Sequence, residues 1–375
     1  MRLFHRMTAA VAAAGALTAA GLALPIAAQA QQHRTGAFIS RFHHLRTIGS
    51  TVPANGDVNP YGIVVIKHSV GRLAAHDILI SNFNNKKNEQ GTGHTIVELS
   101  PGGHRTVFAN ISEASLPSKC PGGIGLSTAL VVLPGGWVIV GSTPSRNGSV
   151  STSGPGCLML LNSQGMVEQV WSGGAINGPW DATAVAHHRT ASVFVDNVLN
   201  GTRAANGKRV FRGTVLRFDL MLNGRNQAPV LASTTKIGQG FAEQGNASAF
   251  VLGPTGLGLS HGTLYVAETD TNRIKAIPAA RTRMTSDGNG TLVTSGGRLS
   301  NPLGLAIAPD GHILTVNGNN GLIVETTPGG SQIASRLLDS SGSPKGAGAL
   351  FGLAVWRGHG VYYVDDAQNT LRLLH

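Results

Sequence analysis

The chain has 375 residues, of which 41% are hydrophobic, 13% are charged and 51 are glycine. The low charge, set against roughly 25% in typical globular proteins, and the abundant glycine favour an all-β protein with many turns. No apolar run after residue 30 is long enough to cross a bilayer, which excludes a membrane span in the mature protein. The formal net charge of +11 favours an anionic small molecule or an anionic envelope polymer as ligand, with solubility alone as the alternative explanation.

The first 30 residues have the three-part layout of a secretory signal peptide. A basic start at Arg2 and Arg6 precedes an Ala/Leu-rich run, which ends in the cleavage pattern Ala28-Gln29-Ala30. We expect residues 1–30 to be cleaved and residues 31–375 to be periplasmic or secreted, with a retained anchor as the alternative. An exported protein rarely meets nucleic acid, so we expect no nucleic-acid partner.

Residues 51–375 contain six repeats of one phrase, in which a turn and a small residue precede an apolar strand. The small residue is Gly62, Gly125, Asp181, Gly256, Gly304 and Gly352 in the six repeats. Spacings near 40 to 50 residues with several short strands each are typical of propeller blades. Residues 36–50 belong to no repeat, and the sixth repeat ends one strand short. We therefore expect residues 36–50 to supply its outer strand and to close the ring.

Each repeat is expected to form four antiparallel strands, a to d, counted outward from the axis. In the fifth repeat these are residues 303–308, 312–317, 321–326 and 332–338, separated by Asp-Gly, Asn-rich and Gly-Gly turns. In this topology the b–c and d–a loops share one face, called here the b–c face. The a–b and c–d turns share the other, called here the a–b face. The predicted fold is one six-bladed β-propeller over residues 31–375.

The fourth and fifth repeats resemble a known family. Pro302-Leu-Gly-Leu-Ala-Ile-Ala-Pro-Asp-Gly-His-Ile-Leu is similar to the opening of an NHL repeat, and Leu264-Tyr-Val-Ala-Glu-Thr-Asp-Thr-Asn-Arg-Ile is similar to its second and third strands. The resemblance is clear in repeats four to six and degenerate in the first three. NHL propellers include protein-binding modules, lyases and relatives of lactonases, so the resemblance implies a fold and not a reaction.

Repeats one to three carry insertions in their b–c loops, at residues 84–93, 143–156 and 199–213. The first and third are basic, through Lys86 and Lys87 and through Arg203 and Arg209 among others. We expect a cationic rim around the channel mouth on the b–c face, with ordinary solvated loops as the alternative.

The two cysteines fall on the same predicted face. Cys120 lies in the d–a loop before the second repeat, and Cys157 ends the b–c loop of that repeat. We expect one disulfide between them, with buried free thiols as the alternative.

The residue that ends strand b is polar in every repeat. The six are Asn82, Ser142, Asn197, Glu268, Asn317 and Asp365. Oxygen ligands of this kind suit Ca²⁺, and calcium lactonases of related propeller folds hold metal with such residues. Asn82, Asn197, Glu268, Asn317 and Asp365 are thus candidate metal and ligand contacts. The alternative is that each hydrogen-bonds its own turn.

Three residues at the tops of inner strands complete the candidate set. Tyr61, Trp180 and Asp181 are expected to face the mouth, and Asp181 stands where the other repeats have glycine. A structural Asp that caps a turn is the alternative. Adjacent histidines, as in His187-His188, point to opposite faces of a strand and are not expected to chelate one metal.

Three functions remain open on the sequence. The preferred one is a ligand-binding, protein-binding or scaffold module that uses the b–c face and has no certain cofactor. The second is a Ca²⁺-dependent hydrolase of the lactonase type, with Asp181, Glu268 and Asp365 as candidate catalytic groups. The third is a quinone-cofactor dehydrogenase, which the lack of a histidine in the strand-b set disfavours.

Overall fold

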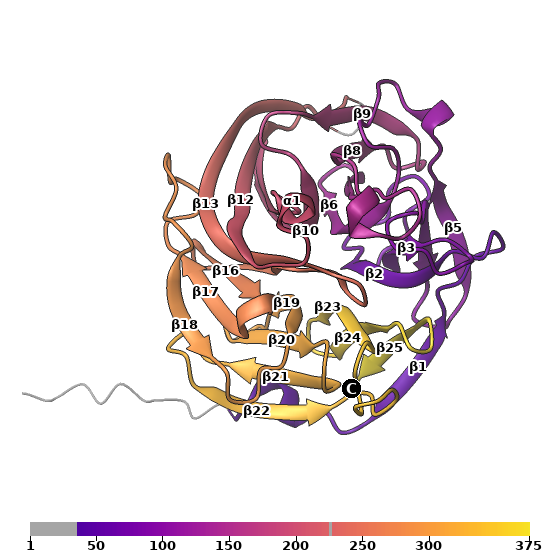
Figure 1. The fold of residues 1–375 in the computed structure, drawn as a ribbon. Coiled ribbons are helices and arrows are strands. Elements are labelled where there is room, and N and C mark those ends of the chain that lie inside the picture. Colours follow the sequence, from indigo (N-terminus) through magenta and orange to yellow (C-terminus); the bar gives the residue numbers. More distant parts are fainter. Residues whose placement is uncertain (1–35, 225–226) are drawn as a thin grey trace, which may run out of the picture. The chain divides into compact units, whose positions relative to one another are not determined.

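The computed structural model describes residues 36–224 and 227–375, which form six antiparallel sheets arranged as a ring (Figure 1). Each sheet is one blade with its a strand at the centre, so the predicted all-β six-bladed propeller is confirmed. The predicted signal peptide lies outside the described residues. None of the helices within residues 36–224 and 227–375 has the length and apolar character of a membrane span.

Every blade has the expected four strands, and blade 3 has one more. Blade 1 contains β2 (Val58–Val65), β3 (Ile78–Asn84), β4 (Thr95–Leu99) and β5 (Arg105–Asn110). Blade 2 contains β6 (Leu126–Leu133), β7 (Trp137–Ser142), β8 (Cys157–Leu161) and β9 (Val167–Ser172). Blade 3 contains β10 (Gly178–His187), β11 (Thr190–Val198), β12 (Val210–Met221), β13 (Val230–Asn246) and β14 (Phe250–Leu252). Blade 4 contains β15 (Pro254–Ser260), β16 (Thr263–Glu268), β17 (Arg273–Ile277) and β18 (Thr291–Ser295). Blade 5 contains β19 (Pro302–Ile307), β20 (Ile313–Asn317), β21 (Leu322–Thr326) and β22 (Gln332–Leu337). Blade 6 contains β23 (Leu350–Trp356), β24 (Gly360–Asp365), β25 (Thr370–Leu374) and β1 (Leu45–Ser50).

In the described parts of the chain, helix is confined to single turns that lie before or between the strands. These are η1 (Phe38–Arg41), η2 (Glu113–Ser115), η3 (Val150–Thr152), α1 (Thr202–Ala205) and η4 (Thr269–Thr271).

The N-terminal strand closes the ring as predicted. β1 pairs antiparallel with β25, with Arg46 opposite Leu373 and Ser50 opposite Thr370. The segment before β1 is fastened to blade 5, because the backbone N–H groups of Phe38 and Ile39 donate to the buried carboxylate of Glu325 at 2.8 and 2.9 Å. Sheet pairing thus ties the two ends of the described chain together, and a charge-assisted anchor holds the segment before β1 on blade 5.

Close packing of the inner strands explains the repeated glycine. A Cβ atom on Gly256, Gly304 or Gly352 would lie 2.1 to 2.3 Å from a backbone oxygen of the next blade. Any side chain there would push neighbouring inner strands apart. Blade 3 differs, because Asp181 extends its carboxylate to blade 4 and accepts the Leu257 N–H at 2.7 Å. This bridge is a structural role for Asp181.

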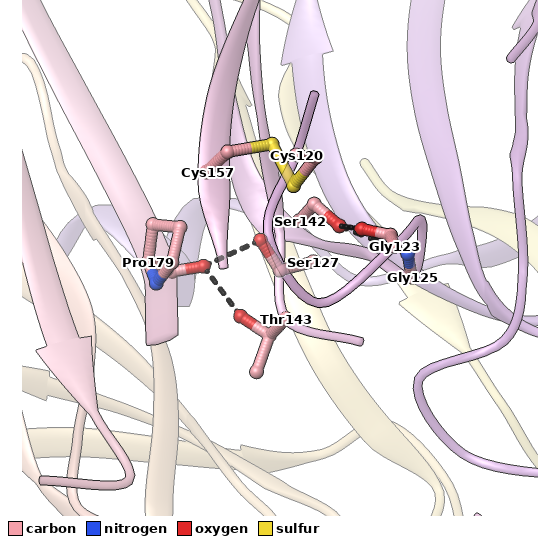
Figure 2. The surroundings of a disulfide bond; sticks show 8 residues. All are labelled: Cys120, Gly123, Gly125, Ser127, Ser142, Thr143, Cys157 and Pro179. Carbon is pink, nitrogen blue, oxygen red and sulfur yellow. Dashed lines mark hydrogen bonds between the residues drawn. A yellow bond between two sulfur atoms is a disulfide. The ribbon is translucent and has the colours of Figure 1, made fainter. Parts of the chain in front are cut away.

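Hydroxyl groups join other neighbouring blades near the axis. The bonds run from Ser81 Oγ to Ser127 O, from Ser127 Oγ and Thr143 Oγ1 to Pro179 O, and from Thr269 Oγ1 to Pro302 O. Figure 2 shows the two that converge on Pro179. Because the bonded groups are buried, each bond satisfies a carbonyl that water does not reach.

The predicted disulfide is present on the b–c face. Cys120 and Cys157 are joined with their Cα atoms 5.5 Å apart (Figure 2). Beside the disulfide, the Gly122 N–H donates to Pro155 O at 2.8 Å. The long b–c loop of blade 2 is thereby fixed to the d–a loop that precedes the blade.

Candidate functional site

A hairpin that the sequence did not predict lies over the channel mouth. β13 continues past its blade, turns at Ala247–Ala249 and pairs with β14, with Gly245 opposite Val251. We call residues 243–252 the cap hairpin. Its tip reaches past blade 2 to blade 1 (Figure 1), where Gln90 Nε2 donates to Ala247 O at 3.4 Å and to Ser248 O at 2.9 Å. The mouth is therefore closed.

Aromatic rings fill the space beneath the cap hairpin. Trp180 contacts Tyr61, Phe83 and Phe250, with ring centroids 5.4, 5.3 and 6.2 Å apart, and Tyr61 also packs on Phe351 at 4.3 Å. Tyr61 is 3% exposed and Trp180 is 1% exposed. The two residues therefore face one another in a packed cluster beneath the hairpin, and their expected contact with a ligand stays a prediction.

Two carboxyl groups adjoin this cluster. The Asp181 backbone N–H donates to Asp196 Oδ1 at 2.6 Å, and both side chains are buried. Burial raises the pKa of Asp181 to about 8. Burial and the neighbouring Asp181 charge raise the pKa of Asp196 well above its usual range. Two close buried carboxyls cannot both ionise without strong repulsion, so the pair holds a proton at neutral pH.

Further buried polar groups surround the mouth. Burial raises the pKa of Asp366 to about 7 and that of Glu243, on the cap hairpin, to about 8. Among the described residues, no partner is found for Tyr61 OH, Trp180 Nε1 or Asp196 Oδ2. Buried polar groups thus adjoin the aromatic cluster, and burial shifts the Asp366 and Glu243 carboxyl groups toward their protonated forms.

The polar residues at the ends of the b strands are engaged with loops. Asn82 Nδ2 donates to Thr51 O, and Asn317 Nδ2 donates to Arg298 O. Asn197 Oδ1 accepts from the Asn177 N–H, and Ser142 Oγ accepts from the Gly125 N–H. Glu268 accepts from the Ala242 N–H and the Thr271 hydroxyl, and Asp365 accepts from Arg372 at 2.9 Å. These bonds favour the alternative role in turns and loops. The same hydrogen bonds do not support Ca²⁺ binding by these residues, which stays a prediction.

The three candidate catalytic carboxyls are committed to different partners. Asp181 bridges to Leu257, Glu268 holds Ala242 and Asp365 pairs with Arg372. They come from blades 3, 4 and 6, and none is hydrogen-bonded or ion-paired to another. The structure therefore does not assemble them as one catalytic set.

One group of potential metal ligands occurs elsewhere. It consists of Asp310, His312 and Glu325, whose potential ligand atoms all lie within 4.8 Å of one another. In the described part of the chain, no other group of at least three His, Cys, Asp or Glu residues meets this criterion. Glu325 already accepts two backbone N–H groups, and His312 Nδ1 lies 2.7 Å from its Oε1. The N-terminal anchor described above accounts for this group.

The predicted cationic rim is only partly free. Arg209 is ion-paired to Asp270, and Arg203 donates to the backbone oxygen of Ser153 at 3.1 Å. Lys86 and Lys87 are exposed on the b–c loop of blade 1. The rim therefore carries less unpaired charge than the sequence alone suggests.

A groove of about 520 Å³ opens on the b–c face between blades 2 and 3. Its walls come from the b–c loops of blades 2 and 3, the loop before β10, and strands β12 and β13. The lining residues are Pro155, Gly173, Gly174, Ala175, Ile176, Asn177, Leu199, Asn200, Gly201, Thr214 and Lys236. The disulfide-fixed loop of blade 2 thus supplies one wall, through Pro155.

The groove presents a specific set of polar groups. Asn177 Nδ2 donates to Val198 O, and Asn200 Nδ2 donates to Asn197 O. The side-chain oxygens of the two asparagines take no part in these bonds. The Thr214 hydroxyl is buried, and no partner is found for it among the described residues. Lys236 contributes an exposed ammonium group. Two amides, one hydroxyl and one cation therefore line the groove beside the apolar Ile176 and Leu199.

Sequence reasoning identified this face but not this groove. It placed the insertion at residues 199–213, which contributes Leu199, Asn200 and Gly201. It did not single out Asn177, Thr214 or Lys236, because the length of β12 and β13 was not recognised. The interval from Asp181 to Gly256, the longest between repeats, was the available signal for extra structure in blade 3.

Comparison with known proteins supports the fold. No family model and no curated protein matches the chain. A gluconolactonase from Xanthomonas campestris has a similar structure at 11% sequence identity, with 88% of each chain covered and a TM-score of 0.51. A virginiamycin B lyase from Staphylococcus aureus is 13% identical over 88% of this chain and 98% of its own, with a TM-score of 0.47. At 11% identity, the likeness to the gluconolactonase shows a shared fold and leaves the activity open.

Proposed function

We propose that this chain is an exported binding module that holds a small anionic saccharide, such as a sugar acid, in the groove between blades 2 and 3. The observation that carries the proposal is that Lys236, Thr214 and two asparagines line one concave site of the b–c face. Concave sites with a few convergent polar groups are the usual place for small ligands.

The chemistry of the lining indicates the ligand class. The Lys236 ammonium complements a carboxylate or phosphate. The amide oxygens of Asn177 and Asn200 accept hydrogen bonds from hydroxyl groups. Ile176, Leu199 and Pro155 offer apolar surface to the C–H face of a sugar ring. A neutral apolar ligand would leave the Thr214 hydroxyl unpaired.

A thermal-shift screen followed by calorimetry tests the proposal. Uronic acids and sugar phosphates are expected to raise the melting temperature, and neutral sugars are expected to have smaller effects. Lys236→Gln should weaken binding by about tenfold or more, as expected for a charge-assisted contact. Lys345→Gln, at an exposed site of blade 5's d–a loop, is the matched control and should bind like the unaltered protein. Equal binding by both variants would overturn the assignment.

The lactonase alternative has no specific observation in its favour. Its candidate carboxyls are separated and engaged, and Asp181 lies beneath the cap hairpin. The quinone-dehydrogenase alternative likewise gains no residue set. We therefore propose binding rather than catalysis.

A further inference from the structure

The histidines of the chain gather on the face opposite the groove. The described residues contain twelve, and all but His94 lie in or beside the a–b and c–d turns or at the adjoining chain ends, which share the a–b face. The eleven are His43, His44, His68, His76, His104, His187, His188, His261, His312, His359 and His375. Ten of them are exposed, the exception being His312. The blade topology thus assembles residues far apart in sequence into one imidazole-rich surface.

Exposed apolar side chains share this face. Met166 is 58% exposed in the c–d turn of blade 2, and Met284 is 75% exposed in that of blade 4. Met221 and Val230, which flank the c–d turn of blade 3, are 44% and 52% exposed. Long apolar side chains at the tips of turns on three neighbouring blades are unusual on a surface that meets only water.

The other charged groups of this face are mostly basic or already paired. Lys67, Arg105, Arg189, Arg281 and Arg357 are exposed, and Arg41 lies at the adjoining N-terminal turn. Arg72 donates to Val107 O and Phe108 O, and Arg336 donates to Phe42 O. Among the acids, Asp287 pairs with Arg283, Asp219 with Arg217, and Asp310 lies 3.5 Å from His312. Glu98 accepts the Ala74 N–H, Glu168 accepts from Asn162, and Glu325 holds the N-terminal segment.

Asp77 is the acid nearest to the exposed histidines of blade 1. Burial raises its pKa, and the nearby His104 and His76 oppose that shift when they are charged. Two imidazoles thus compete for one partly buried carboxylate, and the remaining exposed histidines have no ion-pair partner among the described residues. Histidine is the side chain type that ordinarily changes its charge between about pH 5 and pH 8.

We propose that the a–b face docks on an anionic lipid surface and that protonation of its histidines strengthens docking at mildly acidic pH. Cationic side chains attract anionic headgroups, and apolar tips enter the headgroup region. The exposed methionines select a lipid surface over a soluble polyanion, which would use only the charges. The groove on the opposite face stays open to solution when the a–b face is docked, and this inference does not depend on what the groove binds.

Vesicle co-sedimentation of the full chain tests this proposal. With vesicles of phosphatidylcholine and phosphatidylglycerol at a ratio of 7:3, binding should be about tenfold tighter at pH 5.5 than at pH 7.5, because several added charges each strengthen attraction to the surface. Vesicles of phosphatidylcholine alone should bind weakly at both values. Equal binding at the two pH values would overturn the proposal.

Variants separate the contributions of charge and apolar contact. The triple variant His187→Gln, His188→Gln and His261→Gln removes three of the ten exposed histidines and should reduce the pH dependence, whereas His94→Gln, on the b–c face, should leave it unchanged. Met166→Ser with Met284→Ser should weaken vesicle binding at pH 5.5 and leave heparin binding unchanged. If heparin binds more tightly than vesicles and the methionine variant binds vesicles normally, the partner is a soluble polyanion and the lipid proposal fails. All substituted side chains are partly or fully solvent-exposed, and unchanged melting curves would verify folding.

Discussion

The ring of Phe250 stacks on the indole of Trp180, with ring centroids 6.2 Å apart and ring planes 12° from parallel. Phe250 belongs to the cap hairpin, and Trp180 lies near the start of β10, the inner strand of blade 3. The Phe250 backbone is left-handed, with φ of 62°, a conformation that is strained for a bulky residue. The packing of one inserted side chain therefore holds the hairpin over the channel mouth.

Removing this ring should loosen the cap hairpin. Phe250→Ala is expected to lower the free energy of unfolding by about 3 kcal/mol, as for other buried phenylalanines, and to make Trp180 accessible to a fluorescence quencher. Urea unfolding and acrylamide quenching measure the two effects. Phe211→Ala, at a side chain that is 65% exposed, should change neither. Unaltered quenching in Phe250→Ala would show that other contacts hold the hairpin.

The buried carboxyls should make the protein less stable as pH rises. Because folding raises the pKa of Asp181 to about 8 and also raises that of Asp196, the folded state binds more protons than the unfolded state above about pH 4. The free energy of unfolding should therefore fall between about pH 4 and pH 8. Asp196→Asn should make this fall shallower, because it removes one of the two buried carboxyl groups and its repulsion of Asp181. Urea denaturation midpoints at pH 4.5, 6, 7.5 and 9 would measure how stability changes with pH. An identical pH dependence in the variant and the unaltered protein would contradict the prediction.

The disulfide should contribute substantially to stability. It closes a separation of 37 residues, for which the chain-entropy model gives about 4 kcal/mol. The double variant Cys120→Ser and Cys157→Ser should unfold at correspondingly lower urea concentration. It should also lose ligand affinity in the groove, since Pro155 is no longer fixed. An unchanged unfolding midpoint would mean that the loop contacts alone hold this region.

The anchor at Glu325 should secure the N-terminal segment. Glu325→Gln leaves one amide oxygen for two backbone N–H donors and turns an NH₂ group toward one of them, which should cost about 2 kcal/mol. Limited proteolysis should then cleave near Phe38 earlier than in the unaltered protein. Glu168→Gln, at an exposed acid, serves as the control. Equal protection in both variants would argue that β1 pairing alone retains the segment.

The fold followed from the sequence because its determinants are local and repeated. Inner-strand glycines, Asp-Gly turns and alternating apolar residues fixed the strands of blade 5 to within one residue, and the unassigned segment before Ser50 became β1. The candidate site did not follow in the same way. Whether Trp180 faces a ligand or another ring depends on Phe250, 70 positions later. The side-chain directions of Asn82 and Glu268 likewise depend on loop backbones that no periodic pattern encodes.

The pairing of β1 with β25 has a consequence for assembly of the ring. Blade 6 combines a strand from the beginning of the folded chain with three from its end, so it cannot form until the last residues are available. A chain that emerges amino end first would build five blades as an open horseshoe, with the edge of blade 1 exposed and β1 waiting for its partner. The pairing of β1 with β25 is then a late event, and it joins strands that lie far apart in the sequence. Contacts between distant segments are slow to form. During that interval the unpaired edges are the part of the molecule most exposed to aggregation.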